Sequence, residues 1–508
     1  MRKCFWYGSA AIAALLTASA AQAGTLWIAN LNNANEPAGT VRTNATGIGS
    51  LVLNDAANSA TVRVTHNEAT ANPSPVTAGH IHRGPAGVNG PVIFPFPNAN
   101  SPVGPLVWAI PAAEVTNLRA NGLYVNIHTV QNPGGDIRGQ LFRALLETSA
   151  TTAYQRTVAA ALDVSAGYNT ELDLALIAAN SGTAATKAQA LGDLSGASVY
   201  INTQEAIEAM GDLANAALSQ AGKHRALGAE GDTGFSVFAQ AGSTFGSRKA
   251  RDGATGAQIS RPILVGGLNY AFDGMSAGLA LGYAHGKNKL KDSLGTTTGK
   301  TVAIEGYVSS DFGGSGIVAD ATIGWGWTSY DISRSIPIFA RTATADTKGT
   351  SWGGAIRVAV PLEAGGGFDV SPYLQLDMVE AKVDGYTEGG AGALGLDVTD
   401  VSVANGYSEL GIAIGPESAA SEGSIVPRAH IGWRHALNNG NGSVSTRLVG
   451  STVPFLTPML PSRDGLSLGA SIATRLSGGV ELNLDYRGLV ANPRVNSHSI
   501  TAGVRFRF

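Results

Sequence analysis

The most constraining feature of this chain is a strict two-residue alternation at its carboxyl end. Residues 499–508 read SITAGVRFRF, so a strand formed there carries apolar side chains on one face and small, hydroxyl or arginine side chains on the other. The apolar face ends on two aromatic residues, Phe506 and Phe508. A soluble antiparallel sheet can also alternate in this way. A strand of about ten residues that ends on an aromatic residue nevertheless suits the last strand of a transmembrane barrel.

The same alternation recurs throughout residues 229–508 and predicts a closed antiparallel sheet. Clear instances are residues 277–284, 370–378, 428–434, 466–472 and 480–487. In lipid every backbone N–H and C=O must be bonded within the protein, so such a sheet has to close on itself. Because bacterial barrels have an even number of strands, we predict about twelve, with the apolar set facing lipid and the charged set lining a wet lumen. Periodicity alone would also fit a soluble sandwich, in which the apolar set faces inward.

The amino terminus has the features of a secretory leader. Residues 1–23 begin with Arg2 and Lys3, continue with small apolar residues and end on an Ala-Gln-Ala cleavage motif. The single cysteine of the 508-residue chain, Cys4, lies inside this segment, so we expect a mature protein without disulfides. The net charge of -3 provides no electrostatic footprint for nucleic acid, and we exclude that class of partner.

Residues 146–228 are rich in alanine and predict a helical linker between two β-rich regions. The clearest helix covers residues 202–227, with Asn202 as N-cap and Glu205 completing a capping box. At about 1.5 Å per residue it reaches roughly 36 Å, enough to thread a pore through a bilayer. A helical spacer packed on the N-terminal domain is the alternative. The apolar face of the helix recurs at helical spacing and includes Ile207, Met210, Leu213 and Leu218.

Residues 229–508 resemble the translocator barrel of autotransporters, the type V secretion proteins. The resemblance rests on ILVGGLNY at 263–270, AGLALGYA at 277–284, SPY at 371–373, DGYTE at 384–388, HIGWRH at 430–435 and the terminal RFRF. It implies a twelve-stranded barrel with an α-helix in its lumen, and recognition of Phe506 and Phe508 by the barrel-assembly machinery. Some members of the family cleave themselves within this helix at adjacent asparagines. Residues 202–227 contain no such pair.

Residues 24–145 contain short β-type runs between Pro and Gly clusters, which predicts a Greek-key β-sandwich. This region resembles a CHRD domain, the module named after chordin. The motifs are HIHRG at 80–84, GVNGPV at 87–92, LYVNIHT at 123–129 and PGGDIRGQL at 133–141. The resemblance implies an immunoglobulin-like fold and supplies no settled activity.

Histidines in this domain form a candidate metal site. His80 and His82 share one face of a strand, and His128 lies in a second strand. If these strands are neighbours, three imidazoles and the carboxylate of Asp136 converge, a ligand set that suits zinc or copper. The alternative is a buried polar network in which Asp136 pairs with Arg138 or orients a histidine. No catalytic residues are predicted, because neither a nucleophile elbow nor an H-E-x-x-H helix is recognised.

Together these features predict an outer-membrane protein that is not an enzyme. We expect it to insert the C-terminal barrel, after export by the secretory pathway, and to display the CHRD domain at the cell surface for adhesion or binding. The expected partners are outer-membrane lipid, the barrel-assembly machinery and an extracellular ligand of unknown identity. No cofactor is expected unless the histidines hold zinc or copper. Two alternatives stay open: an exported metal-binding protein or enzyme, and a barrel whose CHRD domain remains periplasmic.

Overall fold

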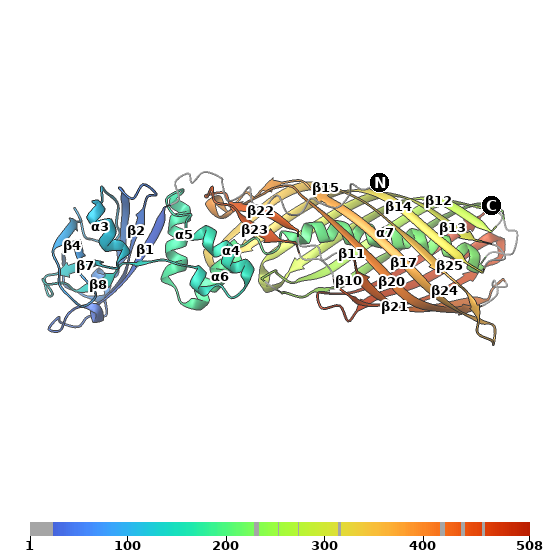
Figure 1. Cartoon of the computed structure of the whole chain (residues 1–508), viewed down its shortest axis with the longest axis horizontal. Coiled ribbons are helices and arrows are strands. Elements are labelled where there is room, and N and C mark those ends of the chain that lie inside the picture. Colours follow the sequence, from blue (N-terminus) through green and yellow to red (C-terminus); the bar gives the residue numbers. More distant parts are fainter. Residues whose placement is uncertain are drawn as a thin grey trace.

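The computed structural model describes residues 24–227, 233–251, 253–272, 274–312, 316–416, 422–437, 442–459 and 463–508. The molecule is elongated, with a sheet domain at one end, a group of helices in the middle and a large barrel at the other end (Figure 1). The predicted leader, residues 1–23, lies outside the described residues. Within the described ranges, no helix is both long enough and apolar enough to cross a membrane.

Twelve antiparallel strands of the described chain form a closed barrel, which confirms the prediction from the alternation. Each strand pairs with the next along the chain, and the first strand closes the barrel by pairing with the last, so that Val237 lies opposite Phe506. A short strand, β16 (Leu362–Glu363), pairs with β17 at one rim. The barrel strands are β10 (Gly234–Arg248), β11 (Ala257–Phe272), β12 (Met275–Leu290), β13 (Gly295–Asp311), β14 (Val318–Ile336), β15 (Arg341–Ala359), β17 (Phe368–Val383), β20 (Val401–Pro416), β21 (Ile425–Ala436), β24 (Gly465–Arg475), β25 (Val480–Val490) and β26 (Val495–Arg507).

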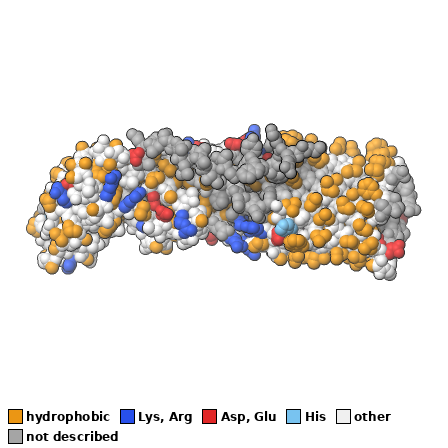
Figure 2. All heavy atoms as spheres, viewed as in Figure 1, with side chains coloured by type: hydrophobic (Ala, Val, Ile, Leu, Met, Phe, Trp, Pro, Cys, Tyr) orange, Lys and Arg blue, Asp and Glu red, His pale blue; other side chains and the backbone are white. Residues whose placement is uncertain are grey.

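The outer wall of the barrel is apolar, and its lumen side is mostly polar. Leu279 and Leu281 on β12 are 65% and 62% exposed, whereas Gln375 on β17 and Arg505 on β26 are buried. Figure 2 shows apolar side chains spread over the barrel half of the molecule. A sheet that faces water on its outside would turn the apolar set inward, so this wall is suited to contact with lipid.

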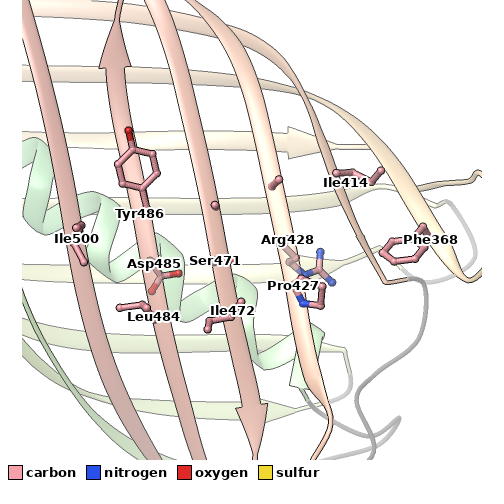
Figure 3. A pocket seen from close by; sticks show the side chains of 12 residues that line it. Phe368, Ile414, Pro427, Arg428, Ser471, Ile472, Leu484, Asp485, Tyr486 and Ile500 are labelled. Carbon is pink, nitrogen blue, oxygen red and sulfur yellow. The ribbon is translucent and has the colours of Figure 1, made fainter.

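A groove of about 520 Å³ lies on the outer surface of the barrel wall, across strands β17 to β26 (Figure 3). The small side chains of Ala429 and Ala470 leave this hollow, and Arg428 and Asp485 also border it. Because most of the lining is hydrocarbon, acyl chains of a bilayer would fill it at little cost. The large apolar side chains around it are Phe368, Ile414, Ile472, Leu484, Tyr486 and Ile500.

Helix α7 (Tyr200–Leu227) lies inside the barrel (Figure 1). Glycines in the wall allow the helix to approach closely: a Cβ at Gly282 would lie 2.7 Å from a methyl carbon of Leu213. The helix predicted to thread the pore is therefore present. The alternative, a helical spacer packed on the N-terminal domain, is not formed by these residues. Of the four predicted lumen residues, the first three are buried and the last is half-buried: Ile207, Met210, Leu213 and Leu218.

The start of α7 differs from the prediction. The helix begins at Tyr200, so Asn202 and Glu205 lie within the helix and do not form a capping box. The carboxylate of Glu205 instead accepts a hydrogen bond from Arg261 on the barrel wall, at 2.7 Å. A guanidinium partner that is distant in sequence competes successfully with the local backbone N–H. The predicted helix end at Gly228 lies outside the described residues.

Three shorter helices cover one mouth of the barrel and pack against its two longest connections. The connections, residues 384–400 and 437–464, contribute a small sheet in the order β18-β19-β22-β23. Buried side chains from the helices, this sheet and the start of α7 form one hydrophobic core. The elements are α4 (Ala153–Leu162), α5 (Thr170–Ser181), α6 (Ala184–Leu194), β18 (Tyr386–Thr387), β19 (Leu396–Val398), β22 (Ser443–Leu448) and β23 (Phe455–Pro458). We call α4–α6 the helical cap.

The N-terminal domain is an antiparallel sheet that curls around one core. Its order is β5-β4-β7-β8-β1-β2-β3-β6, with β9 beside β1, so β8 returns next to the β1-β2-β3 meander as in a Greek key. Ile81, Ile127 and Ile137 face the core. The strands are β1 (Thr25–Asn32), β2 (Thr46–Leu53), β3 (Ala60–His66), β4 (Val76–Arg83), β5 (Val92–Pro95), β6 (Val103–Trp108), β7 (Leu123–Thr129), β8 (Ile137–Gln140) and β9 (Phe142–Arg143), and the helices are α2 (Glu68–Ala71) and α3 (Ala112–Arg119).

Candidate functional site

An acidic side of α7 meets two arginines of the barrel wall. Glu205, Glu208 and Asp212 recur at helical spacing. The guanidinium of Arg261 on β11 lies 2.7 Å from Glu205 and 3.0 Å from Glu208. It also lies 2.9 Å from Asp212, and Arg248 on β10 contacts Glu208 at 2.8 Å. Arg261 is fully buried, and a buried guanidinium is tolerated only where carboxylates compensate it, so this cluster fixes the helix in the lumen. We call it the Arg261 cluster.

Two further arginines hold the other half of α7. Arg487 on β25 donates to the side-chain oxygen of Asn215 and lies 3.4 Å from Glu409. Arg505 on β26 donates to the backbone carbonyl of Gln220 and, at 2.9 Å, to its side-chain oxygen. The helix is therefore bonded to the wall at several levels between residues 205 and 220.

Little space remains between α7 and the wall. A cavity of about 150 Å³ lies there, lined in part by Arg261, Asp377 and Arg434. A polar cavity of this size has room for a few water molecules. The described part of the chain is thus a barrel whose lumen is largely filled by its own helix.

Polar contacts fasten the helical cap to the barrel mouth. Arg334 on β14 lies 2.6 Å from Glu388 in the first long connection and donates to the backbone carbonyl of Asp193 on α6 at 2.7 Å. Ser165, which follows α4, contacts Ser451 in the second long connection at 2.8 Å. These bonds are buried and join segments that are far apart in sequence, so the cap forms a fixed part of the barrel mouth.

In the N-terminal domain, the register of β4 and β7 brings three histidines together. Ala78 lies opposite His128, and His80 lies opposite Asn126, so His80 and His128 are diagonal neighbours on one face. His82 follows on the same face of β4. One nitrogen from each of the three imidazoles lies within 4.8 Å of the other two. The predicted convergence of these residues therefore occurs.

Backbone carbonyls orient two of the imidazoles. His82 Nδ1 lies 2.9 Å from the carbonyl oxygen of Gly90, and His128 Nδ1 lies 3.0 Å from that of Pro133. His80 places its Nδ1 3.3 Å from His128 Nε2. His82 Nε2 is buried and has no hydrogen-bond partner within the described residues.

Tyr124 covers one side of the histidine cluster. Its ring stacks on His82 with ring centroids 4.8 Å apart, and the guanidinium of Arg138 lies 3.7 Å from the Tyr124 centroid. Burial lowers the pKa of both His82 and His128. Burial and the two neighbouring imidazoles lower the pKa of His80 to about 4. All three rings are therefore neutral at physiological pH, and each offers a lone pair.

Asp136, the predicted fourth ligand, does not share this arrangement. It precedes β8 and lies in a turn, so the rule for faces of a strand does not govern its direction. The alternative pairing with Arg138 is not formed, because that guanidinium donates to Asn89 and to the carbonyl of Val88. The carboxylate of Asp136 accepts hydrogen bonds from side chains of Asn33, Thr43, Asn72, Thr129 and Asn132.

The two residues of the predicted assembly signal lie at the C-terminal rim. Phe506 and Phe508 are 44% and 80% exposed, and the N–H of Phe508 donates to the carbonyl of Phe235 at 3.0 Å. Their recognition by assembly machinery stays a prediction. Residues 465–469, GLSLG, have the spacing of a serine-nucleophile motif. They lie within the regular strand β24 with Ser467 buried, so they form no nucleophile elbow.

Sequence reasoning missed Arg248 and Arg261 as anchors of the helix. The signal was present in two separate places. Arg261 breaks the apolar inward set of β11, and the acidic residues of α7 fall together on one side of the helix. Only the threading of one element through the other brings the two halves of this signal together.

These observations first define a class: an outer-membrane-type barrel with its own helix in the lumen and an additional domain beyond one mouth. Residues 237–487 match the autotransporter β-domain family, and residues 27–141 match the CHRD domain family. The chain therefore carries an autotransporter β-domain, an outer-membrane barrel, with a CHRD domain ahead of it.

Solved structures with a similar barrel fold include autotransporter domains of three bacteria. The translocator domain of NalP from Neisseria meningitidis is 18% identical, with a TM-score of 0.47, over 59% of this chain and 97% of that one. The β domain of Bordetella BrkA is 18% identical, with a TM-score of 0.40, over 54% and 100%. The transport unit of AIDA-I from Escherichia coli is 13% identical, with a TM-score of 0.35, over 58% and 98%. No curated protein matches the chain.

Proposed function

We propose that this protein stays in the outer membrane as one piece and displays its CHRD domain outside the cell as a tethered binding module. The Arg261 cluster carries this proposal. Withdrawing α7 from the barrel would separate its three carboxylates from the guanidinium of Arg261, which stays on the wall, and breaking a buried ion pair costs about 3–5 kcal/mol. A helix bonded in this way supports the proposal that the exported part of the chain stays attached to the barrel.

The lengths of the barrel connections support an outward position for the CHRD domain. The two longest connections, residues 384–400 and 437–464, lie at the mouth that carries the helical cap. The opposite rim has shorter turns, such as residues 360–367 and 476–479. Outer-membrane barrels have long extracellular loops and short periplasmic turns. These lengths support a position of the capped mouth outside the cell.

Contacts between the CHRD domain and the helical cap support presentation at a fixed distance. Leu26, Ile28 and Val52 of the sheet domain belong to the same hydrophobic core as the cap helices. The N–H of Gly24 also donates to the carbonyl of Ala166, at 2.9 Å. A domain held in this way can take up pulling force through the cap, which suits adhesion to an extracellular ligand.

The side of the membrane can be tested with single cysteines, because the sequence after residue 4 contains no cysteine. We choose Asn58→Cys in the exposed β2–β3 turn of the CHRD domain and Glu363→Cys in the exposed β16 segment at the opposite rim. Whole cells are treated with a maleimide that does not cross the outer membrane, before and after permeabilisation.

Display predicts labelling of Asn58→Cys on intact cells and of Glu363→Cys only after permeabilisation. The reverse pattern would contradict display and would support the periplasmic alternative. Each variant acts as the control for the other, since both sites are exposed positions of the same chain.

A further inference from the structure

We propose that His80, His82 and His128 form a mononuclear site for a divalent transition-metal ion, zinc or copper, on the outer face of the CHRD sheet. The three imidazoles come from two adjacent strands and have nitrogens within 4.8 Å of one another. The site is independent of the display proposal, because it depends only on the sheet domain.

Hydrogen bonding fixes which nitrogens can bind a metal. The carbonyl oxygens of Gly90 and Pro133 only accept, so the facing Nδ1 atoms of His82 and His128 must carry their protons. The lone pair of each imidazole then lies on Nε2. An Nδ1–H bonded to a backbone carbonyl, with Nε2 free for the ion, is the usual arrangement around a metal-ligating histidine.

The spacing of one nitrogen pair suits two ligands of a single ion, and a small shift of His82 would add the third. His80 Nδ1 and His128 Nε2 lie 3.3 Å apart. Two nitrogens at about 2.0–2.1 Å from a tetrahedral zinc ion are separated by about 3.3–3.4 Å. An ion at that position would use both lone pairs, and His80 would then direct its Nε2–H toward solvent from its half-buried position.

A purely structural network explains this geometry less completely. A hydrogen bond from His80 to His128 would satisfy that pair, but it would leave His82 Nε2 buried without a partner. His82 is 7% exposed, and an unpaired buried acceptor costs about 1–3 kcal/mol. A metal ion bound by all three imidazoles would give His82 Nε2 the partner that it lacks.

The donor set indicates the chemical class of the ion. Three neutral imidazoles suit zinc and copper, whereas calcium and magnesium require oxygen ligands. Three protein ligands also leave a fourth position for water or an external ligand, as in open zinc sites. The partial exposure of His80 gives that position a route to solvent.

The test uses the full-length protein in detergent, purified without a polyhistidine tag and stripped with a chelator. Zinc and copper are titrated separately against a coloured competitor chelator, and bound metal is counted by mass spectrometry. The variants are His80→Ala, His82→Ala and His128→Ala. His66→Ala is the matched control, because His66 lies in the same domain and contacts the carbonyl of Ala99 outside the cluster.

We expect one ion per chain in the wild type and in His66→Ala, binding at least ten-fold weaker in His80→Ala, and no stoichiometric metal in His82→Ala or His128→Ala. With copper, the wild-type spectrum in electron paramagnetic resonance should show coupling to nitrogen. A wild type that takes up neither metal at equimolar micromolar concentration overturns the proposal, whatever the folding of the variants. Full metal uptake by a His80→Ala/His128→Ala double variant also overturns it.

Discussion

The barrel and the CHRD sheet use the same two-residue alternation with opposite orientation. On the barrel, Leu279 and Leu281 point outward, whereas polar side chains such as Gln375 and Arg505 point into the lumen. On the CHRD sheet, Ile81 and Ile127 point into the core and His80 and His128 lie on the other face. Which face is apolar therefore depends on what surrounds the sheet. The apolar face of the barrel suits lipid, whereas the apolar face of the CHRD sheet packs into the protein core.

The two regions also differ in the kind of partner that they give to buried polar side chains. The lumen of the barrel pairs charges with charges, as in the Arg261 cluster on α7. In the CHRD domain, the buried carboxylate of Asp136 is instead surrounded by neutral groups, among them Asn33, Asn72 and Asn132. The barrel can bury arginine side chains of its wall because a second element, the helix α7, supplies the carboxylates that pair with them.

The largest expected effect comes from breaking the charge pairing in the barrel. Arg261→Met leaves Glu205 and Asp212 without their guanidinium partner and Glu208 with Arg248 alone, and we expect a loss of about 3–5 kcal/mol in the free energy of unfolding. The helix should also leave the lumen more often, so channels in a planar bilayer should conduct more current. Urea unfolding from lipid vesicles and single-channel conductance measure the two effects.

The control for this variant is Lys300→Met, whose partner Asp331 lies 2.8 Å away on the exposed part of the barrel. Solvent screens that pair, so no measurable change in stability or conductance is expected. An Arg261→Met barrel that is as stable and as closed as the wild type would show that α7 is held by apolar packing alone.

A smaller effect should follow when a charge is added to the outward face of each sheet. Leu281→Arg places a guanidinium in the lipid-facing wall and should cost about 2–4 kcal/mol if the site is near the bilayer midplane. Thr65→Arg places the same group on an exposed site of β3 in the CHRD domain, where we expect a change within about 0.5 kcal/mol. Folding titrations into vesicles measure the first, and thermal unfolding of the CHRD domain measures the second. Equal costs would remove the contrast between the two regions.

The smallest effect concerns the pH dependence of the CHRD domain. Burial, with the neighbouring Asp136, raises the pKa of Glu68 from 4.5 to about 7. Between these values the folded domain keeps a proton that the unfolded chain has lost, so the contribution of Glu68 to the free energy of unfolding is full below pH 4.5 and is lost as pH rises to 7.

Glu68→Gln removes this titration. The thermal unfolding midpoint of the variant, measured relative to that of the wild type, should therefore rise as pH is raised from 4.5 to 7. The comparison between the two proteins cancels the opposite contribution of His80, whose low pKa makes stability rise over a similar range. A constant difference between the midpoints would show that Glu68 titrates normally.

Period-two and helical patterns predict much of this molecule because they are local. Ile500 and Phe506 on β26 and Met210 on α7 lie on the faces that the alternation assigns to them. The pairing of His80 and His128 also follows from strand faces, once β4 and β7 are neighbours. CHRD and autotransporter motifs then indicate the order of the domains.

Long-range contacts escape such patterns. The Arg261 cluster replaces the predicted capping box because Glu205 meets a partner from another element. Asp136 turns away from the histidines because its turn is packed against Asn33 and Asn72. The helical cap is fixed by barrel connections whose apolar residues, such as Leu396 and Phe455, have no recognisable spacing.

The outer wall of the barrel faces lipid, and its inner wall faces a plugged, polar lumen. Two neighbouring positions on β26 test this arrangement most directly: Ile500, which points outward, and Ser499, which lines the lumen cavity. Each is replaced by cysteine and spin-labelled in vesicles. Oxygen dissolved in lipid should relax the label at residue 500 more strongly than a water-soluble nickel chelate does, and the order should be opposite at residue 499. The same order at both positions, or a label at residue 499 that contacts lipid, would contradict this arrangement.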